Sequence, residues 1–316
     1  MGEFKLKRVN DVILDPDPSH DWESGAVFNP GTVAEGETVH MLYRAVTGEN
    51  KSTIGYAQLS PEGKVIKRYH HPVIVQEFDR EQWGCEDPRI VPFGGRYLIF
   101  YTGFDGKDII RGENARIMLA ETRDFSKFHK YGMIGPDVQD KDAMIFPEEI
   151  GGKIAFIHRV VPNIQIAFFD DLNHLIQPEK TYWDRHLREL DRFTVMCRET
   201  AWEALKIGAG PPPIRTEAGW LLIYHGVDEQ KVYRAGAALL DEKNPLRVIA
   251  RLPYPILEPE REYEKIGDVN MVVFPEGVVQ FDNEIFVYYG AADKVIGLAA
   301  GNLSELIDAL WKNKVR

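Results

Sequence analysis

The chain has 316 residues, of which 44% are hydrophobic and 28% are charged, a composition typical of a globular protein with a sizeable core. Its formal net charge of −11 argues against nucleic acid as the main partner, because binding to a phosphate backbone requires a basic surface. No stretch approaches the length of a membrane span, the first residues lack the apolar run of a signal peptide, and Cys85 and Cys197 form no disulfide framework, so we expect a cytoplasmic protein that does not contact membranes.

After a turn-rich entry segment (residues 1–24), the chain repeats one pattern five times. Each copy contains short apolar runs bounded by Gly, Pro or Asn, which is typical of strands rather than helices. The marker prolines, spaced about 60 residues apart, are Pro30, Pro88, Pro147, Pro213 and Pro275. A period this regular indicates repeated supersecondary units.

Each unit is predicted to hold a hairpin and a third strand. The expected strands in chain order are residues 26–30, 39–44 and 53–59; 90–91, 97–101 and 115–120; 143–146, 154–159 and 164–168; 213–215, 220–225 and 233–239; and 271–274, 285–289 and 295–300. Radial repetition of such units predicts an all-β fold, a five-bladed β-propeller formed by residues 1–316 as one domain. A β-sandwich or barrel is the alternative, but the small residues in the third strands (Gly55, Gly236 and Gly297) favour tightly packed blades.

Two segments break the pattern. Residues 184–207 are charged with helical spacing and are predicted to form a helical insertion. Residues 302–314 place apolar side chains on one face and predict an amphipathic C-terminal helix, with Asn302 or Ser304 as its N-cap. Both segments are candidate contact surfaces for a homo-oligomer.

Unusual polar residues gather where the strands begin or end. In a hairpin, the start of the first strand and the end of the second lie at the same end of the sheet, so residues at these positions converge on one end of the axis. The residues concerned are Asn29, Asp87 and Arg89 at strand starts, Arg44, Arg159 and His225 at strand ends, Arg215 inside the fourth unit and Asp293 after the fifth hairpin. The sequence thus predicts one depression that combines carboxylates with several cationic side chains.

Each of these residues has a structural alternative. An arginine can belong to a salt bridge on the surface or between blades, Glu86 and Asp87 can cap turns, and His158 can be a core histidine. The prediction therefore depends on the whole set. The histidines show no metal-binding spacing, and the chain holds neither a glycine-rich nucleotide loop nor a Gly-x-Ser-x-Gly motif, so we expect no metal and no organic cofactor.

Seven motifs follow one another between about residue 20 and residue 302: Val27–Gly31, Leu42–Ala45, Glu86–Arg89, His158–Arg159, Gly208–Ile214, Ile223–Gly226 and Tyr289–Asp293. Together they resemble glycoside hydrolase family 130, whose members are five-bladed propellers and mostly phosphorylases of β-mannosides. The resemblance implies inverting phosphorolysis, in which a β-linked manno-oligosaccharide and inorganic phosphate give α-mannose 1-phosphate and a shortened sugar. Phosphate is then a co-substrate, and no cofactor is required.

The resemblance also implies roles for single residues. Asp87 matches the family's general acid, which protonates the glycosidic oxygen through a mannose hydroxyl. Positions that bind phosphate or the sugar are matched by Arg44, Arg159, Arg215, His225 and Tyr233. Asn29 and Asp293 resemble residues that contact mannose, and Glu86 and Arg89, which flank Asp87, are assigned to the substrate as well. Arg215 stands where the family has a lysine, which keeps the charge but changes its geometry.

The chemistry agrees with this set of residues. An inverting glycosidase needs a second carboxylate to activate water, whereas phosphate is already an anionic nucleophile that cations can hold in line. One acid opposite a group of Arg and His side chains is therefore suited to phosphorolysis.

Other functions remain open. A β-mannoside hydrolase would lose the basic residues, a non-catalytic sugar-binding propeller would keep only aromatic platforms such as Trp83, Tyr101 and Tyr289, and an arabinanase-like glycosidase would need a third carboxylate. The segment from His20 to Pro30 favours β-1,2 over β-1,4 linkages. The acceptor sugar depends on the loops at 104–115 and 180–207.

Overall fold

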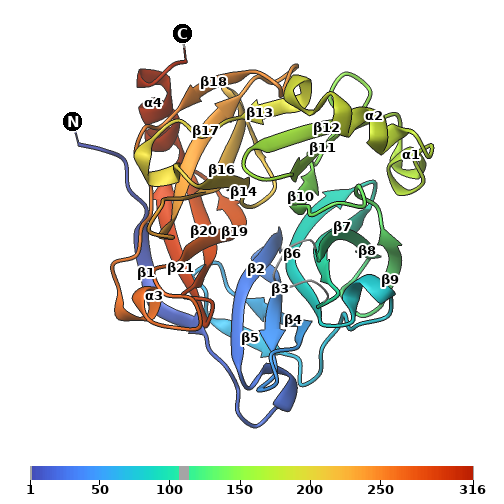
Figure 1. Cartoon of the computed structure of the whole chain (residues 1–316). Coiled ribbons are helices and arrows are strands. Elements are labelled where there is room, and N and C mark those ends of the chain that lie inside the picture. Colours follow the sequence, from blue (N-terminus) through green and yellow to red (C-terminus); the bar gives the residue numbers. More distant parts are fainter. Residues whose placement is uncertain (1, 107–113, 316) are drawn as a thin grey trace.

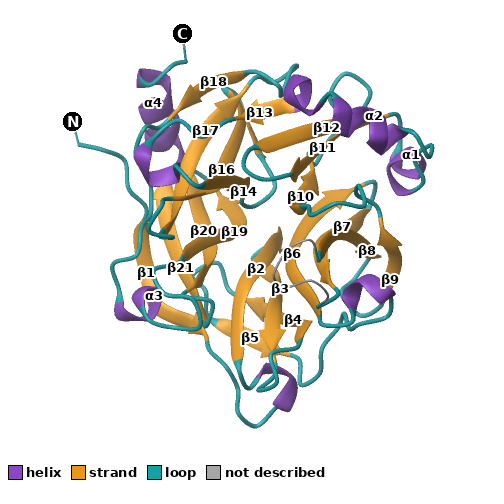
Figure 2. Cartoon of the chain, viewed as in Figure 1, coloured by secondary structure: helices purple, strands orange, loops and turns teal. Residues whose placement is uncertain are grey.

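The computed structural model of the chain describes residues 2–106 and 114–315. Within these residues, antiparallel sheets are arranged around a central axis like the blades of a propeller, and short helices lie at the periphery (Figures 1 and 2). The strands fall into five groups of four or five, which we call blades 1 to 5. None of the helices in the described residues is long and apolar enough to cross a membrane.

The blades follow one another in the sequence. Blade 1 consists of β2 (Ala26–Glu35), β3 (Thr38–Val46), β4 (Ser52–Leu59) and β5 (Val65–Arg68). Blade 2 consists of β6 (Gly84–Phe93), β7 (Arg96–Phe104), β8 (Ala115–Thr122) and β9 (Phe128–Met133). Blade 3 consists of β10 (Lys141–Ile145), β11 (Ile154–Arg159), β12 (Ile164–Phe169) and β13 (Thr194–Met196). Blades 1 and 2 form one continuous sheet, joined by the single parallel pair Ser52 and Gly84.

Blade 4 consists of β14 (Lys206–Ala209), β15 (Ile214–Thr216), β16 (Gly219–Val227), β17 (Tyr233–Leu240) and β18 (Val248–Arg251). Blade 5 consists of β19 (Val273–Phe281), β20 (Glu284–Ala291), β21 (Val295–Asn302) and the N-terminal strand β1 (Lys7–Leu14). The helical elements are η1 (Asp21–Glu23), η2 (Asp79–Glu81), α1 (Leu172–Ile176), α2 (Tyr182–Arg188), η3 (Leu190–Phe193), η4 (Ala201–Glu203), α3 (Glu262–Lys265) and α4 (Leu303–Lys312). The prediction of an all-β fold is confirmed, and the division into five blades follows the period of the sequence.

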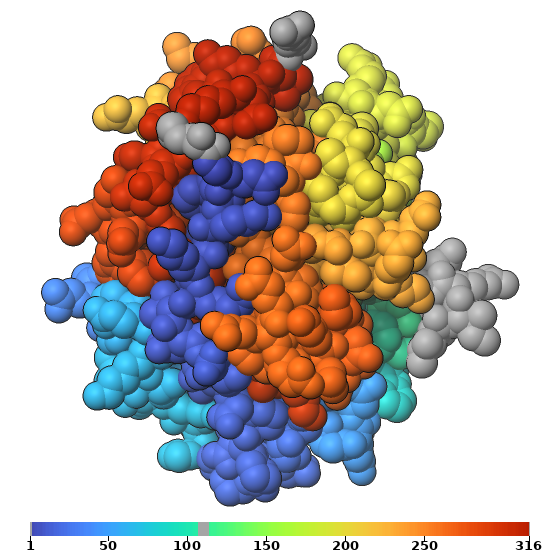
Figure 3. All heavy atoms as spheres, turned by 90° about the vertical axis from the view of Figure 1, so that its left-hand side faces the viewer, coloured from blue at the N-terminus to red at the C-terminus, as the bar shows by residue number. Residues whose placement is uncertain are grey.

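The ends of the chain meet in blade 5. Strand β1 pairs antiparallel with β21, so that Lys7 lies opposite Ala300. Figure 3 shows the N-terminal residues, in blue, running beside the red C-terminal segment. The entry segment is therefore partly a strand, which its turn-rich sequence did not predict.

The predicted C-terminal helix is confirmed as α4. The side chain of Asn302 accepts a hydrogen bond from the backbone N–H of Glu305 and caps the helix, as expected. Its apolar face (Leu303, Leu306 and Leu310) packs on a core shared by blades 4 and 5. Burial of this face stabilises the helix, because a ten-residue helix is marginal on its own.

The predicted helical insertion at 184–207 is correct only at its start. Helix α2 covers residues 182–188 and η3 follows, but residues 194–196 form the outer strand of blade 3. Residues 206–209 already belong to β14, the first strand of blade 4. The charged character of this segment reflects its exposed side and not a continuous helix.

Blade 4 also corrects the predicted strand order. The inner edge of β16 pairs with two short strands: Gly208 of β14 lies opposite His225, and Arg215 of β15 lies opposite Trp220. Residues 210–213 (Gly-Pro-Pro-Pro) separate them, because proline has no N–H to donate to a sheet. The first strand of this blade thus begins at Lys206 and not at Pro213.

A buried polar set recurs in four blades. The tyrosine near the end of the second strand donates its hydroxyl to a fully buried glutamate, and a cation from the outer strand pairs with the same carboxylate. The sets are Glu23–Tyr43–Arg68, Glu81–Tyr101–Lys130, Glu203–Tyr224–Arg251 and Glu264–Tyr289–Arg8. We call them the Glu–Tyr–cation sets. In these four blades they stabilise the end at which the inner strand begins.

Candidate active site

A polar depression of about 290 Å³ lies where the inner strands of all five blades begin. It is lined by Asn29, Arg44, Asp87, Gln139, Lys141, Asp142, Arg159, Val161, Lys206, His225, Tyr233, Val269, Val272, Phe274 and Asp293. Four of these side chains are cationic and three are carboxylates. The convergence that the sequence predicted at one end of the axis is therefore present.

Three of the inner strands present their polar residue by the same backbone device. Asn29, Asp87 and Asp142 have positive φ angles of 47°, 53° and 56°. Each lies at a break in the register of its hairpin, as in a β-bulge. Asn and Asp tolerate this left-handed conformation better than other non-glycine residues, which explains why these residue types occupy the bulges.

Asp87 is surrounded by groups that stabilise its charge. Asn29 donates its Nδ2 to Asp87 Oδ1 at 2.9 Å, Arg44 Nη1 lies 3.5 Å from the same oxygen, and Lys141 Nζ lies 4.0 Å from Oδ2. Burial alone would raise the pKa of Asp87, but Arg44, Lys141 and the hydrogen bond from Asn29 outweigh it and hold the pKa below its ordinary value. With these neighbours alone, Asp87 is ionised at neutral pH.

Asp293 behaves in the opposite way. It lies in the three-residue turn between β20 and β21 (residues 292–294), in which Ala292 and Asp293 both have positive φ (47° and 49°), as the central residues of type I′ turns do. Burial raises its pKa to about 6, although Arg44 acts against this rise and the charge of Asp87 adds to it. Two carboxylates of one depression are thus held at different pKa values.

Asp87 lies in one wall of the depression, and residues of blades 3 and 4 form the other wall. Arg159 Nε lies 2.9 Å from Asp142 Oδ2, and His225 Nε2 lies 3.7 Å from the same oxygen. Burial alone would raise the pKa of Asp142, but Arg159, His225 and Arg89 lower it well below its ordinary value. Asp142 is therefore ionised, paired with the neighbouring cations, and a weak base.

His225, Tyr233 and Lys206 complete this wall. The rings of His225 and Tyr233 are stacked at 6.1 Å, and Lys206 Nζ lies 5.3 Å from the centre of the Tyr233 ring. Burial lowers the pKa of His225 to about 3 and, together with Arg159, lowers that of Lys206 to about 8. Neither ring nitrogen of His225 has a hydrogen-bond partner among the described residues, although both are buried. A ligand that accepts and donates hydrogen bonds would satisfy them.

Glu86 and Arg89 do not line the depression, contrary to the prediction. Glu86 Oε1 accepts from Arg44 Nη2 at 2.8 Å, and its Oε2 lies 3.4 Å from Lys141 Nζ, so Glu86 holds two cations from behind. Arg89 is 1% exposed and donates to the carbonyl oxygens of Ala209 and Gly210 across the axis. Its role is to join blade 2 to blade 4 beneath the site.

The prediction that Arg215 belongs to this depression is wrong. Arg215 lies at the opposite end of blade 4, where it pairs with Glu148 and Glu242 and its guanidinium stacks on Trp220. The cation of blade 4 is Lys206, which starts β14. Three consecutive prolines interrupt the inner strand of blade 4, so the prediction covered only its second half, β15. For this reason the prediction named Arg215 in place of Lys206.

Lys141, Asp142 and Lys206 are site residues that the sequence analysis missed. Lys141 and Lys206 are the first residues of the inner strands of blades 3 and 4, and Asp142 occupies the bulge position of Asn29 and Asp87. Asn29 and Asp87 are each followed by a marker proline, whereas Asp142 and Lys206 are followed by Ala143 and Ile207, so the period of the prolines did not point to them.

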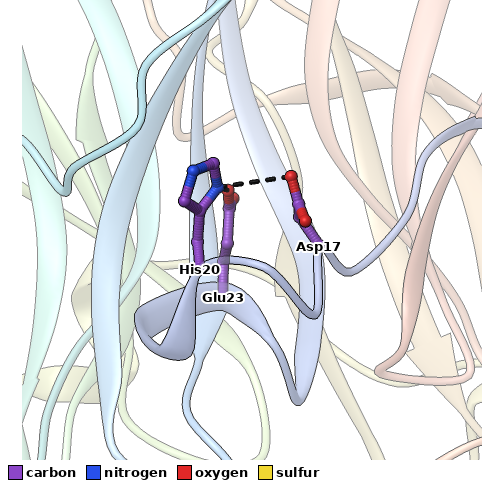
Figure 4. Close-up of side chains that lie close together, drawn as sticks. All are labelled: Asp17, His20 and Glu23. Carbon is purple, nitrogen blue, oxygen red and sulfur yellow. Dashed lines mark hydrogen bonds and ion pairs between the residues drawn. The ribbon is translucent and has the colours of Figure 1, made fainter.

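In the described part of the chain, one group of side chains has metal-like geometry: Asp17, His20 and Glu23 (Figure 4). His20 Nδ1 lies 3.2 Å from Asp17 Oδ2 and 3.1 Å from Glu23 Oε1. Glu23 is also the carboxylate of the first Glu–Tyr–cation set, where its other oxygen pairs with Arg68 at 2.7 Å. Hydrogen bonds and ion pairs account for this group, which lies outside the lining of the depression.

The depression combines the bulge-held acid Asp87 with four cationic side chains, which defines a propeller with a pocket for an anion beside an acid. The family model described as β-1,4-mannooligosaccharide phosphorylase matches residues 10–312. The chain belongs to this family, glycoside hydrolase family 130, and is an enzyme.

Three relatives place the chain within the family. It is 40% identical over 311 residues to a 1,2-β-oligomannan phosphorylase of Thermoanaerobacter sp. (strain X514), covering 96% of this chain and 99% of the relative. It is 41% identical over 310 residues to a β-1,2-mannobiose phosphorylase of the same organism, covering 94% and 97%. The solved structure of β-1,2-mannobiose phosphorylase from Listeria innocua in complex with β-1,2-mannobiose aligns with a TM-score of 0.80 at 25% identity, covering 96% of this chain and 99% of that one.

Proposed function

We propose that the protein catalyses the inverting phosphorolysis of β-mannosides, with β-1,2-linked mannobiose or oligomannan as substrate. The observation that carries this proposal is the arrangement of Asp87 in one wall of the depression and Arg159, Lys206, His225 and Tyr233 in the other. The products are α-mannose 1-phosphate and a sugar shortened by one unit. Inorganic phosphate is the co-substrate, and the reaction needs no cofactor.

In this reaction a phosphate oxygen attacks C1 of the mannose unit while the bond from C1 to the glycosidic oxygen breaks. Asp87 supplies the proton that the leaving oxygen takes up. Asp87 must therefore be protonated in the complex, whereas Arg44 and Lys141 favour its ionised form. A phosphate dianion bound among the cations of the depression opposes their effect and raises the pKa of Asp87, so phosphate binding prepares the acid.

The remaining wall holds the nucleophile. Arg159 offers a charge-assisted hydrogen bond, Lys206 adds a second positive charge, and His225, which is neutral at pH 7, offers a ring N–H. Positioning of phosphate against C1 contributes to the rate because it removes the need for a bimolecular encounter. Asp142 is paired with Arg159 and cannot compete as the base of a hydrolysis.

Asp293 supports one alternative, hydrolysis of the same linkage. A buried carboxylate with a pKa of about 6 is suited to act as a general base toward water. The cations that face Asp87 have no function in that reaction, so phosphorolysis remains our proposal.

The β-1,2 linkage is supported by the names of the two Thermoanaerobacter relatives, which cover nearly the whole chain. The β-1,4 linkage in the description of the family model is the competing choice. We also propose a cytoplasmic location, because the chain's sugar phosphate product is of use inside a cell.

The test is to supply β-1,2- and β-1,4-mannobiose with and without phosphate and to measure mannose 1-phosphate and free mannose. We expect mannose 1-phosphate from the β-1,2 substrate only when phosphate is present. Free mannose formed independently of phosphate would establish the hydrolase, and turnover of the β-1,4 substrate alone would reverse the assignment of linkage.

A further inference from the structure

Blade 3 lacks the Glu–Tyr–cation set of the other blades. In blades 1, 2 and 4 the glutamate stands three residues before the inner strand, but Val138 occupies this place in blade 3. The tyrosine position near the end of the second strand is taken by His158. The same blade supplies Lys141, Asp142 and Arg159 to the depression, which is more charged groups than any other blade.

His158 belongs to a buried chain of hydrogen bonds. Its Nδ1 lies 2.8 Å from Asp140 Oδ2, and the backbone N–H of Arg159 donates to Asp140 Oδ1 at 3.0 Å. Asp140 and His158 are at most 1% exposed. The carboxylate of Asp140 therefore contacts the ring of His158 and accepts a hydrogen bond from the main chain of Arg159, whose side chain lines the depression. Asp140 also directly precedes Lys141 in the sequence.

The chain of hydrogen bonds continues to α2. His158 Nε2 lies 2.9 Å from Nε2 of His186, which is 4% exposed. Burial and the neighbouring His158 lower the pKa of His186 to about 3, so His186 is neutral. With both rings neutral, the contacts are satisfied when His186 Nε2–H donates to His158 Nε2 and His158 Nδ1–H donates to Asp140. His186 thereby fixes the tautomer of His158 that Asp140 needs.

We propose that Asp140, held by His158 and His186, is a positioning residue for the phosphate-binding wall, where it sets the main chain of Arg159 and Lys141. This inference rests on the proposed phosphorolysis. The other blades do not share the device: their tyrosines donate to glutamates that precede the inner strand, and within residues 2–106 and 114–315 these carboxylates form no hydrogen bond or ion pair with a side chain or N–H that lines the depression. Small displacements of a positioning group reduce rates strongly, since the reacting atoms must be aligned closely.

The test compares two variants, each of which replaces a buried polar ring by phenylalanine. His158→Phe keeps the ring between Phe156 and Trp183 but removes the donor to Asp140, whereas Tyr289→Phe removes one buried hydroxyl from the Glu–Tyr–cation set of blade 5. We expect His158→Phe to raise the phosphate KM about tenfold or more, with the sugar KM changed less than about twofold. Tyr289→Phe is expected to lower the melting temperature with both KM values unchanged.

His158→Asn supplies the rescue, because its side-chain amide restores a donor near the position of Nδ1. It should recover most of the phosphate KM. Equal losses for phosphate and sugar in His158→Phe, or no recovery in His158→Asn, would overturn the positioning role. If His158→Phe does not fold, Asp140→Asn keeps the volume of the carboxylate and is expected to give the same selective rise in the phosphate KM.

Calorimetric titration of inorganic phosphate separates this inference from the proposed function. If the wild type binds phosphate but makes no mannose 1-phosphate, the proposed reaction fails, and weaker phosphate binding by His158→Phe still supports the positioning role. If the wild type turns over normally and His158→Phe binds phosphate equally well, only the positioning role fails. Absence of phosphate binding by the wild type would overturn both.

Discussion

Blade 3 and the other four blades solve the same structural problem in different ways. Blades 1, 2, 4 and 5 hold the end near the depression with a buried glutamate, a tyrosine and a cation, while blade 3 uses Asp140, His158 and His186. The repeated solution stabilises the fold, and the blade that departs from it carries more charged groups of the depression than any other blade. In a repeat protein, a departure from the repeat is thus a useful indicator of function.

The largest effect should come from the acid of blade 2. Asp87→Asn keeps the hydrogen-bonding shape of the bulge but cannot deliver a proton, so we expect kcat to fall by about 10²–10⁴-fold. The circular dichroism spectrum should stay unchanged. A folded variant with turnover close to that of the wild type would remove Asp87 from its role.

The Glu–Tyr–cation sets should matter for stability and not for chemistry. Glu203→Gln breaks a fully buried pair with Arg251, and such losses cost about 3–5 kcal/mol because one charge remains buried without its partner. Glu189→Gln, which breaks an exposed pair with Arg192, is the control and should cost less than about 1 kcal/mol. Denaturant unfolding measures both. A selective change in the phosphate KM of Glu203→Gln would contradict the assignment of the Glu–Tyr–cation sets to stability alone.

The two ends of the propeller can be compared through two arginines. Arg159→Ala removes a charge-assisted contact worth about 1.5–3 kcal/mol, so we expect the phosphate KM to rise by about 10- to 100-fold. Arg215→Ala removes an arginine at the far end of blade 4 and should leave the phosphate KM unchanged. Steady-state kinetics at varied phosphate decides the matter, and similar effects of both variants would contradict the placement of Arg215.

The smallest effect concerns pH. The pKa of Lys206 is lowered to about 8, so its positive charge is present below this pH and is lost as the pH rises through it. We expect phosphate affinity to fall about three- to tenfold between pH 7 and pH 9. Lys206→Arg, which stays charged, should flatten this decline when both proteins are titrated in the same buffers. Parallel profiles would show that another group titrates.

Much of the architecture was accessible from the sequence because the period of the marker prolines and the apolar runs are local signals. The third-strand glycines Gly55, Gly236 and Gly297 also have a clear cause, since the rings of Tyr43, Tyr224 and Tyr289 leave no room there for a Cβ. Most of the polar residues predicted from strand starts and ends line the depression, namely Asn29, Arg44, Asp87, Arg159, His225 and Asp293, whereas Arg89 does not. Tyr233, which the family resemblance indicated, lines it as well. Their roles in phosphorolysis remain predictions.

The misses have physical causes. Arg215 was misplaced because the inner strand of blade 4 is split, and a period measured from prolines does not reveal which half borders the depression. The Glu–Tyr–cation sets join residues as distant as Arg8 and Glu264, so no local pattern reveals the pairing. The loop at 104–115, predicted to contact the acceptor sugar, includes residues 107–113, which lie outside the described residues.

The pairing of β1 with β21 has a consequence for how the ring forms. Strand β1, which completes blade 5, is synthesised before blades 1 to 4, yet its partner β21 is synthesised after them. Until β1 docks, β21 has an open edge that can recruit a strand from another chain. Closure is a contact between distant parts of the sequence and is therefore a slow event in folding. A bulky N-terminal fusion that keeps residues 7–14 from this edge would thus favour aggregation during synthesis. It would do so even though β1 is the outermost strand of its blade and lies away from the depression.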